Sequence, residues 1–305
     1  MTTKSLPKGI RKIGFLFKET FNEFINDNAM KLSAALSYYT IFSLPALLII
    51  VTSLCGLYFG TQAINGELYG QIKDLVGSDA ALQIQEMVKN VNLSNHTMLA
   101  TIISVVVLVI GASGLFAEIQ DSINYIWGIK SKPKKGLIRF VVNRLMSFSM
   151  IISVGFLLLV GLIFSALMEL LNKKLLSHFP SETIYLYYFL NIFLLLVLTT
   201  LLFLIIFKML PDGKVSFRDC LFGALFTALL FMGGKFLIGA YLGSSAMASI
   251  YGSAGSIVII LAWVYYSAII LYFGAEFTKV YSKTYGKNII PNKYTILIPR
   301  SQGNL

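Results

Sequence analysis

The chain of 305 residues has few cysteines, few histidines and few charged residues, and each scarcity excludes a class of protein. Its 2 cysteines and 2 histidines lack the spacing of a metal-binding cluster. Cys55 and Cys220 fall in different apolar runs, so we expect both thiols to stay free rather than form a disulfide. Charged residues make up 13% of the chain, compared with about 25% in soluble domains. A disulfide-stabilised domain, a zinc protein and an ordinary soluble domain are therefore not expected.

Motifs of soluble enzymes are absent as well. The glycine-rich segment Gly252–Gly255 lacks the strand, the lysine and the spacing of a phosphate-binding loop. His96 and His178 stand alone, so no Ser-His-Asp arrangement can be assembled around them. The 16 Tyr and 23 Phe suit membrane belts and helix packing better than base stacking. We therefore expect no enzymatic activity, no cofactor, no metal ion and no nucleic-acid partner.

Long apolar runs are the main feature that is present. Hydrophobic residues make up 56% of the chain. Each of six runs is at least about 19 residues long, enough for a helix to cross a hydrocarbon core of about 30 Å. The sequence therefore predicts an all-α, polytopic membrane bundle of six transmembrane helices with short amphipathic interfacial helices. The predicted spans are Ala34–Gly60, Met98–Phe116, Leu145–Met168, Ile184–Phe207, Cys220–Leu242 and Ser256–Ala275.

The positive charges predict the orientation of this bundle. Alternate polar segments, counted from the N-terminus, carry 6, 6, 3 and 5 Lys and Arg, whereas the three segments between them carry 2, 2 and 0. Positive residues are retained on the cytoplasmic side. The pattern predicts a multi-pass membrane protein with both termini cytoplasmic. The net charge of +11 then arises from cytoplasmic segments, so the expected partners are membrane lipids of the anionic inner leaflet.

The polar segments add detail to three predicted regions. Residues 1–30 form a cytoplasmic amphipathic segment, 31–285 the membrane domain and 286–305 a cytoplasmic tail. Two positions suit the N-terminal helix: the inner headgroup layer, or the cytoplasmic face of the bundle itself. Asp27-Asn28 is predicted to cap the helix that follows. Phe116, Ile119, Ile123 and Trp127 share one face of a second helix, which we expect at the interface with Trp127 as its anchor.

Lys235 is the sharpest candidate for a substrate or ion site, because it is the one Lys or Arg within a predicted span. Two positions are open to it. The neighbouring Gly233 and Gly234 favour close helix contact around a polar cavity. Alternatively, the ammonium snorkels toward the outer interface.

Other candidates lie near the cytoplasmic ends of the spans. Glu276 and Glu118 are predicted at one membrane depth, where they either bind or relay a cation or are simply wetted helix ends. Arg144 opens the third span, where it either simply follows the positive-inside rule or pairs with Glu118 or Asp121. Tyr38 belongs to a polar stretch of the first span ahead of Pro45, where a kink is expected.

Five segments of the sequence carry recognisable motifs: 27–45, 120–127, 143–145, 210–211 and 251–276, the last ending in Gly274-Ala-Glu276. Taken in order, these segments resemble the YihY/virulence factor BrkB family, formerly mislabelled ribonuclease BN. The resemblance extends over about residues 10–285 and implies a six-span, multi-pass protein of the bacterial inner (plasma) membrane with cytoplasmic termini.

The resemblance implies little about activity. The lack of cytoplasmic histidine and of a metal cluster argues against ribonuclease activity. One hypothesis is a transporter of a lipid-like, amphipathic or ionic envelope-related substrate, built on the broken first span and Lys235. The other is a membrane scaffold or envelope assembly factor that transports nothing.

Overall fold

The structure is a computed structural model that describes residues 10–41, 114–131, 149, 153, 182–244, 255–292 and 295–297. Helices dominate these residues, and the short strands occur only in the connections. The labelled helices are α1 (Ile10–Asn26), α7 (Glu182–Met209), α8 (Phe217–Ser244) and α10 (Gly255–Tyr285). Residues 29–41 and 114–126 are also helical. The strands are β1 (Ile129–Ser131), β2 (Gly213–Lys214), β3 (Ile290–Pro291) and β4 (Thr295–Leu297).

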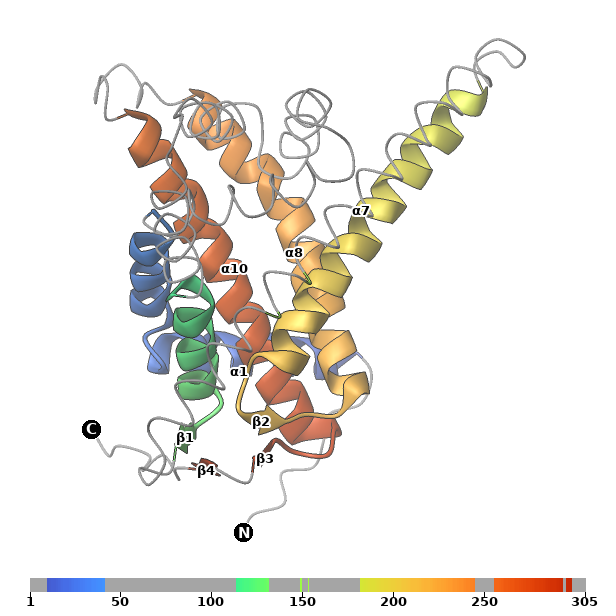
Figure 1. Ribbon diagram of the computed structural model, residues 1–305. Coiled ribbons are helices and arrows are strands. Elements are labelled where there is room, and N and C mark those ends of the chain that lie inside the picture. Colours follow the sequence, from blue (N-terminus) through green and yellow to red (C-terminus); the bar gives the residue numbers. More distant parts are fainter. Residues whose placement is uncertain are drawn as a thin grey trace, which may run out of the picture.

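Three helices in the described part of the chain are long and apolar enough to cross a membrane. Their candidate spans are Phe189–Met209, Phe217–Lys235 and Val258–Tyr285, which correspond to the last three predicted spans. Figure 1 shows α7, α8 and α10 running lengthwise, with α7 leaning away from α8 at the end opposite the strands. This arrangement confirms an all-α membrane bundle. The first three predicted spans lie wholly or mostly outside the described residues.

The helix of the last predicted span continues ten residues past its predicted end, Ala275, to Tyr285. The extension is polar, yet Thr278 and Ser282 are fully buried in it. Thr278 donates a hydrogen bond to the Gly274 carbonyl at 2.7 Å, and Ser282 donates to Asp219 at 3.0 Å. The helix therefore outlasts the apolar run because its buried hydroxyl groups are bonded within the protein.

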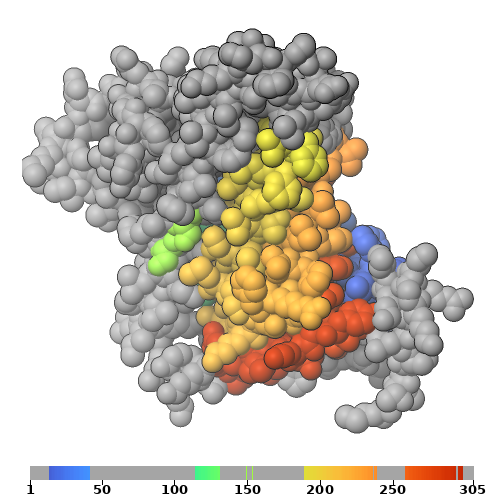
Figure 2. Space-filling view, turned by 90° about the vertical axis from the view of Figure 1, so that its right-hand side faces the viewer, coloured from blue at the N-terminus to red at the C-terminus, as the bar shows by residue number. Residues whose placement is uncertain are grey.

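Reciprocal small-residue contacts join α8 and α10. A Cβ atom at Gly223 would collide with Thr278, and a Cβ atom at Gly274 would collide with Thr227. Each threonine donates a hydrogen bond to the carbonyl of the glycine four residues earlier in its own helix, at 2.6 Å for Thr227 and 2.7 Å for Thr278. The two helices thereby approach closely while their hydroxyl groups remain bonded. We call these four residues the glycine–threonine lock. In Figure 2, α7 and α8 lie side by side on the visible face, and the C-terminal part of α10 lies along their lower edge.

Helix α1 lies across the bundle near the strand-bearing end (Figure 1). Leu16, Thr20 and Phe24 are buried on one of its faces, and the Phe24 ring meets the Phe273 ring of α10 edge to face. Phe17 and Phe21, on an adjacent face, are exposed. Of the two predicted positions, the structure therefore places α1 against the bundle itself, with an apolar strip still open to its surroundings.

The helix through residues 114–126 requires a correction. Its predicted apolar face is real, because Phe116, Ile119, Ile123 and Trp127 are all buried. That face, however, packs in the protein core rather than at the interface. Trp127 is not an interfacial anchor, since its indole N–H donates to the Ala275 carbonyl of α10 at 3.1 Å. A tryptophan needs one hydrogen-bond acceptor, and here the protein supplies it.

The strands tie the connections together. β1 pairs antiparallel with β4, and β2 pairs antiparallel with β3. Both β3 and β4 belong to the segment predicted as a C-terminal tail, 286–305. This segment is therefore hydrogen-bonded to the connections that follow residue 128 and precede α8. Asn28, with φ of 51°, makes the turn from α1 into the next helix, a backbone conformation that asparagine tolerates better than most residues.

Candidate functional site

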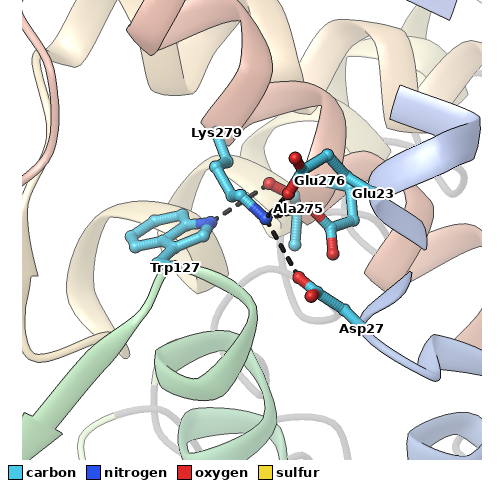
Figure 3. Close-up of polar contacts among 6 residues, drawn as sticks. All are labelled: Glu23, Asp27, Trp127, Ala275, Glu276 and Lys279. Carbon is cyan, nitrogen blue, oxygen red and sulfur yellow. Dashed lines mark hydrogen bonds and ion pairs between the residues drawn. The ribbon is translucent and has the colours of Figure 1, made fainter. Parts of the chain in front are cut away.

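A cluster of four charged side chains joins α1 to α10 (Figure 3). The Lys279 ammonium of α10 lies 2.6 Å from a Glu23 carboxylate oxygen, 2.9 Å from Asp27 and 2.9 Å from Glu276. Asp27 immediately follows α1, and Glu276 lies one turn before Lys279. We call Glu23, Asp27, Glu276 and Lys279 the ionic cluster. It links parts of the chain about 250 residues apart in sequence.

Burial makes this cluster unlike a surface salt bridge. The side-chain exposure is 0% for Glu276, 3% for Asp27, 15% for Lys279 and 26% for Glu23. Glu276 Oε2 accepts a hydrogen bond from Lys279, whereas Glu276 Oε1 is buried and accepts none in the described structure. Removing one partner of a buried ion pair costs far more than removing one partner of an exposed pair. The cluster therefore combines a strong link between helices with one incompletely bonded carboxylate.

The cation that these carboxylates hold is the ammonium group of Lys279. One oxygen from each of Glu23, Asp27 and Glu276 lies within 4.8 Å of the other two, a spacing that also occurs around hard metal cations. The Lys279 ammonium, however, already bonds to all three side chains. Among the described residues this group is therefore an ion-pair cluster rather than a set of metal ligands.

Local sequence spacing brings these groups together. Glu23 and Asp27 are four residues apart, and Glu276 and Lys279 three apart, so each pair shares one side of its helical segment. The ionic cluster forms where these two sides meet. The adjacent Phe24–Phe273 contact, with ring centroids 5.6 Å apart, holds the helices together beside it.

A second polar network lies at the same end of the bundle. Asp212, which follows α7, accepts hydrogen bonds from Gln120 at 3.3 Å and from Asn124 at 3.0 Å. The Asp212 backbone N–H donates to Asn124 Oδ1 at 2.8 Å, and Thr295 donates to the Asp212 carbonyl at 3.0 Å. Gln120 and Asn124 belong to the segment 120–127 that carried the family resemblance. These polar residues thus fix the end of α7 against a neighbouring helix.

Lys235 does not join the ionic cluster. Thr227 of α8 contacts Gly274 of α10, and Lys235 lies eight residues further along α8, or about 12 Å along the axis. Lys235 is partly exposed. Gly234 is buried against Tyr266, so its predicted close contact is confirmed. Gly233 is exposed, and no atom of the described residues lies within 4 Å of the position that a Cβ atom would take there. Lys235 therefore sits at the edge of the α8–α10 contact.

The remaining predicted site residues are dispersed. Glu276 is fully buried in the ionic cluster, Glu118 is partly buried and Asp121 is exposed. Burial raises the pKa of the Glu118 carboxyl, and the nearby Asp121 charge raises it further. Tyr38 is 60% exposed and packs edge to face against Tyr39. Arg144 lies outside the described residues.

Sequence reasoning missed three members of the ionic cluster: Glu23, Asp27 and Lys279. Asp27 was expected as a helix cap, and the other two resemble ordinary polar residues of amphipathic segments. The available signal was the spacing of acidic and basic residues within each segment. This spacing cannot show that two segments so distant in sequence meet.

The long apolar helices and the buried glycine–threonine lock between two of them define an integral membrane protein of the helical class. The model of the family described as Virulence factor BrkB matches residues 20–294. The chain belongs to this family. The match includes every residue of the ionic cluster and of the glycine–threonine lock.

Similar proteins occur in several bacteria and bear the name UPF0761 membrane protein. The chain is 27% identical over 260 residues to the one from Pseudomonas paraeruginosa, which covers 83% of this chain and 59% of that protein. The chain is also 26% identical over 275 residues to the protein from Vibrio vulnificus, and this match covers 88% of this chain and 82% of that protein. The chain thus spans about three fifths of the length of the Pseudomonas relative. No solved structure matches the chain.

Proposed function

We propose that this chain is a transporter, without enzymatic activity, for a lipid-like or otherwise amphipathic or ionic envelope-related substrate. The single observation that carries the proposal is the position of Lys235, a partly exposed cation on a helix of candidate-span length. A charged residue at such a position is expensive and usually serves a substrate or ion pathway. An ammonium group there favours a substrate with an anionic head group.

The helices around the predicted site also expose apolar side chains that could contact an amphipathic substrate. Leu229 and Leu237 of α8 are 54% and 71% exposed, and Phe193 of α7 is 54% exposed. Exposed apolar side chains of this kind match acyl chains. The proposed substrate therefore combines an anionic head group for Lys235 with an apolar part for these helix surfaces.

We further propose that the strand-bearing end faces the cytoplasm of a bacterial cell and that the protein lies in the inner membrane. The distribution of Lys and Arg along the sequence supports this orientation. The bacterial relatives named as membrane proteins support the setting. In this orientation the ionic cluster lies on the cytoplasmic side, next to the anionic leaflet.

The test uses purified protein in liposomes that contain fluorescent phosphatidylglycerol. Externally added dithionite bleaches only the outer leaflet, so bleaching beyond that fraction measures movement between leaflets. We expect the wild type to accelerate this movement, Lys235→Met to abolish the acceleration and Lys235→Arg to retain part of it. Lys31→Met, at an exposed lysine of the helix through residues 29–41, is the matched control and should behave as wild type. Equal rates for empty liposomes and wild type would refute lipid transport and favour the scaffold alternative.

A further inference from the structure

Glu276 differs from the other carboxylates of the ionic cluster in having a fully buried oxygen without a donor. Its side chain is 0% exposed, and Oε1 accepts no hydrogen bond from the residues that the structure describes. An ionised carboxylate placed away from water is costly unless both of its oxygens are hydrogen-bonded or paired. A bound proton removes the charge and most of this cost.

Lys279 cannot supply the missing donor. Its ammonium has three N–H groups, and its three acidic partners are Glu23, Asp27 and Glu276. One N–H group is thus available for each carboxylate. Glu276 accepts one of these N–H groups at Oε2, at 2.9 Å, and Oε1 accepts none from Lys279.

The described groups packed around Glu276 include two acids and one base. Helix α1 and the residue after it contribute Glu23 and Asp27, and α10 contributes Lys279. From α8 the nearest turns present Gly223 and Thr227, which carry no charge. From the end of the helix through residues 114–126 comes Trp127, whose N–H is used by the Ala275 carbonyl. Neighbouring carboxylates favour the protonated form of Glu276, and the ammonium group opposes them.

We propose that Glu276 is a proton-binding site at the contact between α1 and α10. The carboxylate takes one proton from water on Oε1 and becomes a neutral carboxylic acid, and releasing that proton restores the carboxylate. In the protonated state Lys279 pairs more strongly with Glu23 and Asp27, because Glu276 no longer competes for its charge. Proton binding therefore tightens the hold of α10 on α1. This inference does not depend on transport of any substrate.

Infrared spectroscopy of the purified full chain in nanodiscs tests the proposal directly. A protonated carboxyl group has a C=O stretch that is separate from the carboxylate bands. We expect the wild type at pH 7 to show this acid band, and we expect glutamate labelled with ¹³C in its carboxyl group to shift it. Glu276→Gln should abolish the band, whereas Glu23→Gln, at the most exposed acid of the cluster, should retain it.

Lys279→Met provides a second arm that does not require Glu276→Gln to fold. Removing the ammonium group removes the charge that favours the ionised form, so the acid band should persist to higher pH than in the wild type. Absence of an acid band at pH 7 in the wild type would overturn the proposal. So would a band that survives Glu276→Gln, or one whose pH range is unchanged by Lys279→Met.

Discussion

The close contact between α8 and α10 can be tested at Gly223, where a single added methyl group meets Thr278. A Cβ atom at Gly223 would lie 2.9 Å from Thr278 Cβ and 3.3 Å from Cγ2, and it would also collide with Oγ1. Carbon atoms pack best at about 3.5–4.0 Å. Gly223→Ala must therefore push the helices apart or rotate Thr278 away from its hydrogen bond to the Gly274 carbonyl.

The expected magnitude follows from two opposing effects. Overpacking a close contact costs about 1–3 kcal/mol, while replacing a helical glycine by alanine gains up to about 1 kcal/mol. Gly233→Ala isolates the second effect, because Gly233 lies in the same helix and no described residue comes within 4 Å of the position of its added Cβ atom. The propensity gain cancels between the two variants. We therefore expect Gly223→Ala to be less stable than Gly233→Ala by about 1–3 kcal/mol.

Unfolding in mixed micelles with increasing sodium dodecyl sulfate, followed by circular dichroism, measures this difference. The double variant Gly223→Ala with Thr278→Ala should recover part of the lost stability, because the colliding side chain is shortened. Equal stability of Gly223→Ala and Gly233→Ala would refute the close helix contact on which this reasoning rests.

Three further predictions concern the charged residues and the orientation of the protein in the membrane. Lys279→Met should lower the free energy of unfolding by roughly 3–5 kcal/mol, as expected for a buried ion pair that loses one partner. Adding Glu276→Gln to Lys279→Met should restore part of the lost free energy of unfolding. An unchanged unfolding curve for Lys279→Met would contradict the burial of the ionic cluster. Because the pKa of Glu118 is raised in the folded state, stability should fall as pH rises through the range between its unfolded and folded values. In thermal unfolding, Glu118→Gln should therefore be more stable than wild type at pH 7, and the gap should close below about pH 4. A stability difference between Glu118→Gln and the wild type that does not change with pH would contradict this prediction. In a cysteine-free background, Lys287→Cys should be labelled from the cytoplasm and Ser177→Cys from outside, whereas the opposite pattern would overturn the orientation.

The sequence predicted the helical bundle well because hydrocarbon thickness imposes a length that can be counted. The last three predicted spans coincide with α7, α8 and α10 in position. The end of α10 was missed because its last turns are stabilised by partners on α8 and α1 rather than by apolar composition. Trp127 was misplaced for a related reason. Composition shows that an indole needs an acceptor, but it cannot show that the Ala275 carbonyl provides one.

The candidate site was only partly predictable. Glu276 was identified from its position near the end of an apolar run, and the structure places it in the ionic cluster. Its partners on and beside α1 could not be identified, because their contact depends on how α1 turns across the bundle. Lys235 and Glu276 are both charged groups near apolar segments, yet they occupy different levels along α8 and α10. Depth along a membrane axis can be counted from sequence, whereas lateral neighbours cannot.

The pairing of β1 with β4 has a consequence for the order in which the molecule matures. Ile129 pairs with Leu297, so 168 residues separate the partners. At a synthesis rate of about 5–20 residues per second, the second strand emerges roughly 8–34 s after the first. By then α7, α8 and α10 have all been made. The β1–β4 pair can therefore form only after these three helices have been synthesised.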